Sequence, residues 1–274
     1  MEACLLIHGF TGGVHELAPL AGFLESKGIR VGTFTLSGHG GSRKEMQDAG
    51  SREWIASAEA ALGKLLDEHG QVHLIGFSTG ALIATRLAAL YKERIASLTL
   101  LSTPVFPLHP PAIARTLVQP KMVGRYIRNL FIVPSRAARE FYRLVDESLE
   151  WYEEAQAPAL IVQGAKDHLV KPRSAAYLQE RLGAERKELL ILSRSGHLVC
   201  HSPDQLELFD TVLDHVKRAS DSPPTPPAKS SDSAARTEDN RTGRSNPSNR
   251  KIKTDPPSFV PRERAFFMRE EKIL

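Results

Sequence analysis

Short apolar runs alternate with longer amphipathic stretches over the first 218 residues of the chain. This alternation is typical of a parallel sheet with helices on both faces. The apolar runs predict six strands: Ala3–His8, Ile29–Thr35, Val72–Phe77, Ile95–Ser102, Ala159–Gly164 and Glu188–Ser193. The stretches between and after them predict five helices: His15–Lys27, Glu53–His69, Ser78–Tyr91, Pro172–Leu182 and Pro203–Lys217. We therefore expect one α/β domain over residues 1–218, with a mostly parallel sheet of about six strands.

The alternation is interrupted between residues 104 and 157. Six prolines lie in this segment, and no strand pattern is evident in it. Apolar residues recur at helical spacing over Ser135–Ala155, and this spacing predicts an amphipathic helix. The apolar residues are Phe141, Leu144, Val145, Leu149 and Tyr152. An ordinary crossover between parallel strands needs only a dozen or so residues. The segment therefore predicts a small helical cap over the ends of the strands.

The composition changes after Arg218. Residues 220–249 are rich in Ser, Pro, Thr, Asn and charged side chains, with little to bury, so residues 219–274 are predicted to be a disordered tail. Its end regains apolar side chains beside several arginines: Phe259, Val260, Phe266, Phe267 and Met268. These residues suit a short helix that docks on a partner, a membrane surface or the core, or an extension without a role. The sequence leaves these alternatives open, and the tail's partner unknown.

Charge and cysteine content narrow the class of protein. Residues 1–218 hold 25 basic and 24 acidic side chains, so most of the net charge of +4 belongs to the tail. No basic stripe with interleaved aromatic residues is present, so we expect no nucleic-acid partner. Cys4 and Cys200 are too few for a disulfide framework and are expected to be reduced and buried. No apolar stretch approaches the ~20 residues that span a bilayer, and we expect a cytoplasmic protein.

The segment Gly76-Phe77-Ser78-Thr79-Gly80 joins a predicted strand to a predicted helix. A serine at such a junction takes a strained backbone conformation, and its hydroxyl projects into the open. Strand and helix approach so closely that the positions two before and two after the serine must be small, and both are glycine. A phosphate-binding loop would need a different glycine pattern, which is absent. Ser78 is therefore the candidate nucleophile.

A serine hydroxyl needs a base to remove its proton, and the base needs an acid to fix its tautomer. His197 follows the last predicted strand in Ser195-Gly196-His197 and is the candidate base, with His201 in reserve. Asp167 follows the strand Ala159–Gly164 and is the candidate acid, with Asp146 as a weaker rival. His197, Cys200 and His201 suggest a metal cluster only weakly, because no carboxylate spacing completes it.

A tetrahedral intermediate also needs hydrogen-bond donors for its oxyanion. One candidate is the backbone N–H of Thr79, the residue after the nucleophile, at a helix N-terminus. The other is the backbone N–H of Phe10, in the segment His8–Gly13 after the first strand. That segment alone also suits a simple strand-ending turn. Beside the serine turn, the oxyanion role is the favoured interpretation.

These motifs, in this order, resemble those of the α/β-hydrolase superfamily, and within it the small bacterial carboxylesterases related to monoacylglycerol lipases. The resemblance runs from Leu5 to about Val216, and the matching residues are Leu5–Gly12, Leu36–Gly40, Trp54, Gly76–Gly80, Asp167 and Ser195–His197. It implies an α/β-hydrolase fold, a catalytic triad at the matching serine, aspartate and histidine, an oxyanion donor after His-Gly, and a helical cap where residues 104–157 fall. The leading antiparallel strands of larger relatives are missing, so the sheet is expected to be minimal. The tail has no counterpart in the family.

The resulting hypothesis is a serine hydrolase that cleaves carboxylic esters through an acyl-enzyme, with Ser78, His197 and Asp167 as the triad. It requires no metal or organic cofactor, and the apolar segment Val105–Val133 favours a small apolar ester substrate. Two alternatives remain at this stage. One is a monoacylglycerol lipase or thioesterase with the same triad, and the other is a catalytically silent hydrolase-fold protein that binds a ligand or partner.

Overall fold

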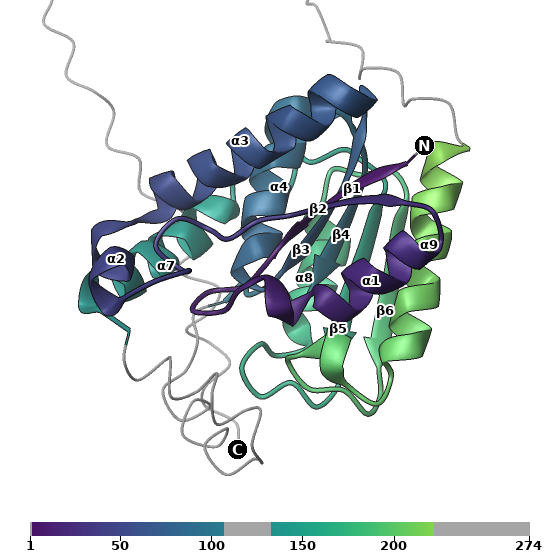
Figure 1. Ribbon diagram of the computed structural model, residues 1–274. Helices are drawn as coiled ribbons and strands as arrows, with labels where there is room; N and C mark the ends of the chain where they lie inside the picture. The colour runs from purple at the N-terminus through teal and green to yellow at the C-terminus, as the bar shows by residue number, and fades with distance from the viewer. Residues whose placement is uncertain (1, 107–132, 222–274) are drawn as a thin grey trace, which may run out of the picture. The chain divides into compact units, whose positions relative to one another are not determined.

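Six parallel strands form one sheet in the part of the chain that the structure describes. The structure is a computed structural model, and it describes residues 2–106 and 133–221 (Figure 1). The strands are β1 (Ala3–Ile7), β2 (Arg30–Thr33), β3 (Val72–Phe77), β4 (Ile95–Leu101), β5 (Ala159–Gly164) and β6 (Lys187–Leu192). Their order across the sheet is β2-β1-β3-β4-β5-β6, and every neighbouring pair is parallel. The predicted six-stranded sheet is confirmed.

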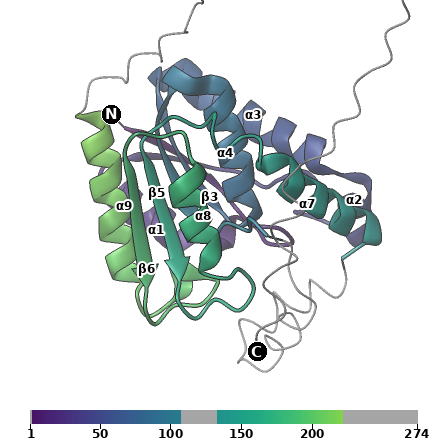
Figure 2. The ribbon, with the colours of Figure 1, turned by 180° about the vertical axis from the view of Figure 1, so that it is seen from behind.

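Helices cover both faces of the sheet (Figures 1 and 2). On one face lie α1 (Ala18–Ser26) and α9 (Gln205–Ser220). On the other face lie α3 (Ser51–His69), α4 (Thr79–Tyr91) and α8 (Arg173–Arg181). The remaining described helices are η1 (Val14–Glu16), α2 (Arg43–Asp48), η2 (Lys92–Arg94), α7 (Ser135–Ser148) and η3 (Val199–His201). The expected α/β arrangement with helices on both faces is confirmed.

Hydrophobic periodicity does not predict the short helix α2, which a capping pair identifies instead. Ser42 Oγ accepts a hydrogen bond from the Glu45 N–H at 3.3 Å, and the Glu45 carboxylate accepts one from the Ser42 N–H at 3.2 Å. This reciprocal pair is a capping box. Because α2 buries none of its six residues, its sequence carries no apolar pattern. The cap is the only local signal for it.

The helix predicted over Ser135–Ala155 ends earlier than expected. After Ser148 the N–H groups of residues 149–151 bond to carbonyls three residues back, so the chain tightens into turns. Leu149, expected on the apolar face, is consequently 43% exposed. The observed helix, α7, contacts α2, α3 and α4, and the Glu140 carboxylate accepts hydrogen bonds from the Ser51 N–H and Oγ at 3.2 and 2.9 Å.

Much of the predicted cap and almost all of the predicted tail lie outside the described residues. Within the cap, residues 107–132 are not described, and within the tail, residues 222–274 are not. The helix α9 continues to Ser220, two residues into the segment predicted as tail. The boundaries of the cap (104–157) and of the tail (219–274) therefore stay predictions.

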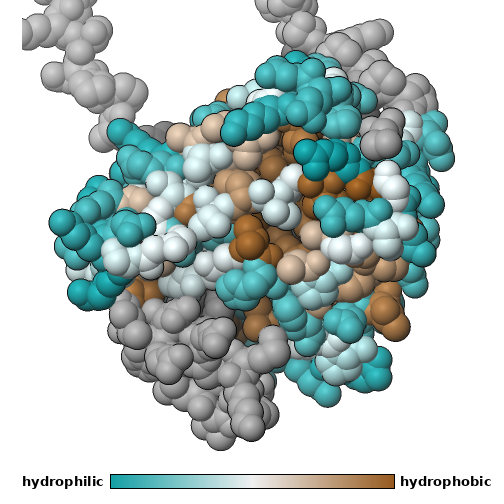
Figure 3. Space-filling view, in the orientation of Figure 1, coloured by the Kyte–Doolittle hydropathy of each residue, from teal (hydrophilic) through white to brown (hydrophobic). Residues whose placement is uncertain are grey.

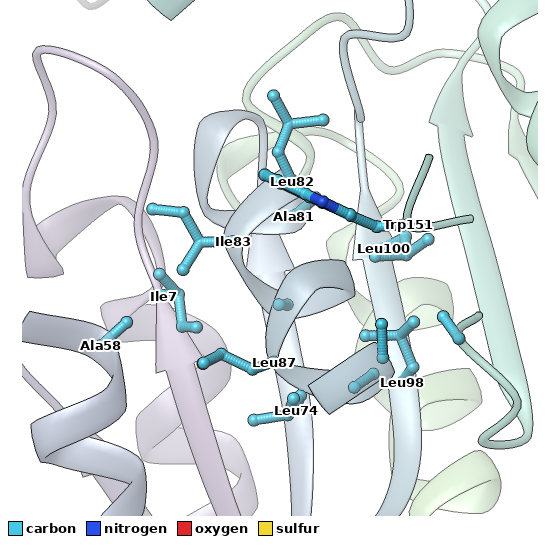
Figure 4. Close-up of a cluster of buried hydrophobic side chains, with 14 of the residues drawn as sticks. Ile7, Ala58, Leu74, Ala81, Leu82, Ile83, Leu87, Leu98, Leu100 and Trp151 are labelled. Atoms are coloured by element: carbon cyan, nitrogen blue, oxygen red, sulfur yellow. The ribbon is translucent and has the colours of Figure 1, made fainter. Parts of the chain in front are cut away.

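The larger of two apolar clusters fills the space between the sheet and helices α3, α4 and α8 (Figure 4). It includes Ile7, Leu74 and Leu98 from three neighbouring strands, and Leu82 and Leu87 from α4. Burying one such leucine contributes roughly 1.5–3 kcal/mol. The second cluster lies under α1 and α9. With both faces covered, the four inner strands β1, β3, β4 and β5 read as nearly continuous apolar runs. Apolar surface remains visible over the β1 and β2 side of the sheet (Figure 3).

The turn between β3 and α4 brings the two glycines of the serine segment against neighbouring backbone. A Cβ atom added at Gly80 would overlap the carbonyl oxygen of Ile7, and one added at Gly76 would overlap the carbonyl oxygen of Gly80. Ile7 is the last residue of β1 and pairs with Gly76 across the sheet. The glycines therefore allow the start of α4 to lie directly against the end of β1.

Both cysteines are buried and free, as expected. Among the described residues, no helix is both long enough and apolar enough to cross a membrane.

A buried histidine ties the end of α9 to the sheet. His73 Nδ1 lies 2.8 Å from Ser97 Oγ of β4, and its Nε2 lies 3.2 Å from Ser220 Oγ of α9. Burial, reinforced by nearby His215, lowers the pKa of His73 to about 4. The ring is therefore neutral in the folded protein, and each of its nitrogens has a hydroxyl partner.

We predict that Gly80→Ala lowers the free energy of unfolding by about 3 kcal/mol or more, because the new methyl group meets backbone that cannot yield cheaply. The matched control is Gly63→Ala in α3, where an added Cβ meets no atom within 4 Å. That change should raise the free energy of unfolding by roughly 0.5–1 kcal/mol, because alanine favours the helix. Urea denaturation of both variants measures the difference. Equal stabilities for the two variants would contradict the close approach of α4 to β1.

We also predict that acid destabilises the protein through His73. The unfolded state protonates this ring below its ordinary pKa of 6.5, whereas the folded state protonates it only near 4. The stability contributed by the neutral ring is therefore complete above pH 6.5 and is lost as the pH falls toward 4, by on the order of 3 kcal/mol. Urea denaturation between pH 7.5 and 4.5 measures the loss. In His73→Gln the same pH range should change stability less, and an equally steep dependence would refute the assignment.

Candidate active site

Ser78 occupies the sharp turn between β3 and α4, in the backbone conformation that the sequence predicts. Its φ of 53° and ψ of −118° lie outside the regions that residues with a side chain ordinarily adopt. The turn is held on both sides: the Ser78 N–H donates to the Leu101 carbonyl at 2.8 Å, and the Ala81 N–H donates to the Ser78 carbonyl at 2.9 Å. These bonds fix the position of the hydroxyl at the carboxyl edge of the sheet.

The structure brings Ser78, His197 and Asp167 together at this edge. His197 Nε2 lies 3.2 Å from Ser78 Oγ, and His197 Nδ1 lies 2.8 Å from Asp167 Oδ2. The three side chains come from the loops after β3, β6 and β5, and all three residues are buried or half-buried. Since the Nδ1–H must donate to the carboxylate, Nε2 is left as the acceptor that faces the serine hydroxyl.

The two reserve candidates lie elsewhere. The His201 Nε2 lies 3.0 Å from the carbonyl oxygen of His15, and the residue is exposed. Asp146 is exposed on α7. Neither is brought into the hydrogen-bonded chain of Ser78, His197 and Asp167.

The Asp167 carboxylate is held by four donors. Its Oδ1 accepts from the N–H groups of Leu169 and Val170, both at 2.9 Å. Its Oδ2 accepts from Gln163 Nε2 at 3.1 Å as well as from His197. Sequence reasoning missed Gln163, although a polar residue in the otherwise apolar strand Ala159–Gly164 was a visible signal. Together these bonds fix the carboxylate that faces the imidazole.

A second carboxylate anchors the loop that carries His197. Asp204 Oδ2 accepts from the Arg194 N–H and from Ser195 Oγ, each at 2.8 Å, and Oδ1 accepts from Arg194 Nε at 2.6 Å. These bonds hold the pKa of Asp204 below its ordinary value, against the opposing effect of desolvation. Farther along the loop, Ser102 Oγ donates to the carbonyl of His197 at 3.1 Å. The backbone on both sides of the imidazole is thus fixed.

The backbone N–H groups of Phe10 and Thr79 have no acceptor among the described residues. Thr79 is the first residue of α4, so its N–H has no partner within the helix and lies at the positive end of the helix dipole. The Phe10 side chain is buried against Phe141 of α7, and the two rings are stacked with their centroids 5.1 Å apart. Two unpaired donors are therefore present at the positions that the sequence predicts for oxyanion donors.

His8 fixes the peptide group that carries the Phe10 N–H. Its Nδ1 donates to the Gly9 carbonyl at 2.9 Å, and its Nε2 accepts from the Leu36 N–H at 3.0 Å. Burial lowers the pKa of His8 to about 4, so the ring stays neutral and can use one nitrogen in each role. Because the Gly9 carbonyl and the Phe10 N–H belong to one planar peptide, holding the carbonyl also orients the N–H.

A cavity of about 160 Å³ opens beside this loop. Its lining is mixed polar and apolar and consists of Thr11, His39, Gly41, Ser42, Arg43, Met46 and Pro134. His39 Nδ1 donates to the Ser37 carbonyl at 3.1 Å, which leaves Nε2 as an acceptor without a partner among the described residues. No group of three potential metal ligands occurs within the described residues.

Two family models match the chain. The model described as the alpha/beta hydrolase fold matches residues 3–137, and the one described as serine aminopeptidase, S33 matches residues 126–204. Together they span residues 3–204, which include every residue of the candidate site, and α9 lies beyond them.

Proteins named as lipases or esterases match over most of the chain. The thermostable monoacylglycerol lipase of Bacillus sp. (strain H-257) is 25% identical, with 77% of this chain and 88% of that protein covered. The carboxylesterase of Bacillus subtilis (strain 168) is 19% identical, with 79% and 93% covered. A solved structure from the work on LipS and LipT, two metagenome-derived lipolytic enzymes, superposes with a TM-score of 0.68 at 22% identity, with 79% and 93% covered. The chain therefore belongs to the α/β-hydrolase superfamily, and its esterases and lipases are the members it resembles.

Proposed function

We propose that the protein is a serine hydrolase that cleaves carboxylic esters through an acyl-enzyme intermediate. The observation that carries the proposal is the hydrogen-bonded chain from Ser78 Oγ through His197 to Asp167 Oδ2, with distances of 3.2 and 2.8 Å. The relatives named as monoacylglycerol lipase and carboxylesterase support an ester as the substrate.

In the first half of the reaction, Ser78 Oγ attacks the ester carbonyl while its proton passes to His197 Nε2. Asp167 keeps the imidazole in the required tautomer and stabilises the positive charge that the ring acquires. The negative charge that develops on the carbonyl oxygen is held by the N–H groups of Phe10 and Thr79. The tetrahedral intermediate then collapses, the bond to the leaving oxygen breaks, and His197 returns the proton to the departing alcohol.

In the second half, water replaces the alcohol. His197 Nε2 takes a proton from the water as it attacks the acyl-enzyme, and the collapse of the second tetrahedral intermediate releases the acid and restores Ser78 Oγ–H. These steps need only the protein's own side chains, its backbone N–H groups and water, and no cofactor.

The acyl part of the substrate is proposed to be apolar. Phe10, Phe141 and Trp54 form an aromatic cluster beside the oxyanion donors, and Val105 is buried just after β4. The rest of the apolar segment Val105–Val133 lies largely outside the described residues. Two alternatives share the same triad: a monoacylglycerol lipase, which is a narrower form of this proposal, and a thioesterase, which would cleave a carbon–sulfur bond instead.

The proposed setting is the cytoplasm, because both buried thiols are unpaired, as is typical of a reducing compartment. No nucleic-acid partner is proposed, since residues 1–218 are close to neutral. The partner of the predicted tail stays open.

We predict that Ser78→Ala and His197→Gln each lower kcat on short p-nitrophenyl esters by about 1000-fold or more, because each removes a member of the proton-transfer chain. Asp167→Asn should lower it by about 1000- to 10000-fold, by favouring the wrong tautomer. Steady-state kinetics on the purified variants measure these losses.

Ser26→Ala provides the matched control, since Ser26 is an exposed serine at the end of α1, and its kcat should equal that of the wild type. Circular dichroism establishes that each variant is folded. If the folded Ser78→Ala variant turned over the ester at the wild-type rate, the proposed mechanism would be refuted.

We further predict that kcat/KM rises with acyl chain length over p-nitrophenyl acetate, butyrate and octanoate, because each added methylene that is buried contributes about 0.8 kcal/mol. Monoacylglycerols and acyl thioesters of the same chain length, assayed in parallel, separate esterase, lipase and thioesterase preferences. A protein that binds these compounds and turns over none of them would be a silent member of the fold.

A further inference from the structure

The loop that carries the Phe10 N–H contains a glycine whose backbone is free to rotate unless other groups hold it. This oxyanion loop, Gly9–Gly13, includes three glycines, and within it the Gly12 N–H donates to the Gly9 carbonyl in a weak turn at 3.3 Å. Glycine populates conformations that other residues avoid. The direction of the Phe10 N–H therefore depends on what fixes φ and ψ of Gly9.

Two side chains hold the two peptide groups of Gly9. The carbonyl, in the peptide that carries the Phe10 N–H, accepts from His8 Nδ1. The N–H, in the preceding peptide, donates to Glu16 Oε2 at 2.8 Å. A peptide group is planar, so fixing both planes fixes both soft dihedrals of the residue between them. His8 by itself fixes only the peptide plane that follows Gly9, and Glu16 fixes the plane that precedes it.

Glu16 is a carboxyl side chain buried inside the protein. It is only 4% exposed, and its carboxyl group lies so close to Gly12 that an added Cβ there would overlap it. Its Oε1 has no hydrogen-bond partner among the described residues. Burial raises its pKa to about 7, partly offset by the Gly9 N–H and by His197. Burying such a group costs free energy that an apolar side chain of similar size would not cost.

We propose that Glu16 is a positioning residue for the oxyanion hole: by accepting the Gly9 N–H, its carboxyl oxygen orients the next peptide so that the Phe10 N–H faces the reacting carbonyl. This inference rests on the proposed esterase function and adds to it a residue outside the triad. A protonated carboxyl and an ionised one both offer an acceptor oxygen. The role therefore does not depend on the charge of Glu16.

The test compares three variants and one control variant in the full-length protein. Glu16→Leu removes the acceptor and keeps the volume, and its kcat on p-nitrophenyl butyrate should fall about 30-fold, less than the ~100- to 1000-fold of removing an oxyanion donor outright. Its KM should change less than about threefold, because the lost interaction acts in the transition state. Glu16→Gln keeps a carbonyl acceptor and should restore kcat to within about fivefold of the wild type.

Gly12→Ala tests the same contact without altering Glu16, and it decides the question should Glu16→Leu not fold. Its new methyl group overlaps the Glu16 carboxyl group and should displace it from Gly9, with a loss of kcat similar to that of Glu16→Leu. Gly22→Ala in α1, where an added Cβ meets no atom within 4 Å, is the matched control and should leave kcat unchanged.

A second readout separates positioning from a general structural role. A trifluoromethyl ketone forms an oxyanion on the enzyme, and its affinity should fall in parallel with kcat/KM in Glu16→Leu and Gly12→Ala. Affinity for the matched methyl ketone should stay the same. Wild-type kcat in Gly12→Ala, or equal losses in Glu16→Gln and Glu16→Leu, would overturn the proposal. If Ser78→Ala stays active in the same assay, the proposed function fails and this inference with it; if Ser78→Ala is inactive and the loop variants are unimpaired, only the inference fails.

Discussion

The contact between Gly80 and the carbonyl oxygen of Ile7 is the constraint on which the site depends. Gly80 lies in the first turn of α4, and Ile7 is the last residue of β1, so this contact sets the distance between the serine turn and the loop that follows β1. One of those segments carries the proposed nucleophile, and the other carries the Phe10 N–H. Any side chain at position 80 would separate them. The packing of one helix on one strand thereby determines whether nucleophile and oxyanion donor face the same point.

The other half of the site is fixed in the same way. A Cβ atom added at Gly164, the last residue of β5, would overlap the carbonyl oxygen of Gly196, which precedes His197. Between the two halves, the end of β4 and the residue after it supply the connection. The Ser78 N–H donates to the carbonyl of Leu101, and Ser102 Oγ donates to the carbonyl of His197. Neighbouring parallel strands therefore hold their terminal loops in register. The triad side chains then need only short hydrogen bonds to meet.

The sequence predicted the parts of this arrangement that have a local signature. Apolar runs located all six strands, and the glycines around Ser78 predicted its strained turn, which the φ of 53° matches. Asp167 and His197 could be selected because they follow strands at the same edge of the sheet. Gln163 carried a signal as a polar residue in an apolar strand, but its contact with Asp167 depends on how the loop between them folds back. Glu16 carried no such signal, because its contact with the Gly9 N–H depends on the path of the glycine-rich loop. The early end of α7 was missed because apolar residues recur at helical spacing past Ser148, whereas the α-helical hydrogen bonds end there.

The central claim is that Ser78 is the one serine that His197 and Asp167 activate. The most direct measurement is labelling of the native protein with a fluorophosphonate, followed by mass spectrometry of its peptides. The account predicts a single adduct, on the peptide that contains Ser78, and its loss in His197→Gln although the serine is still present. An adduct on another serine, or ester turnover that survives complete labelling of Ser78, would contradict it.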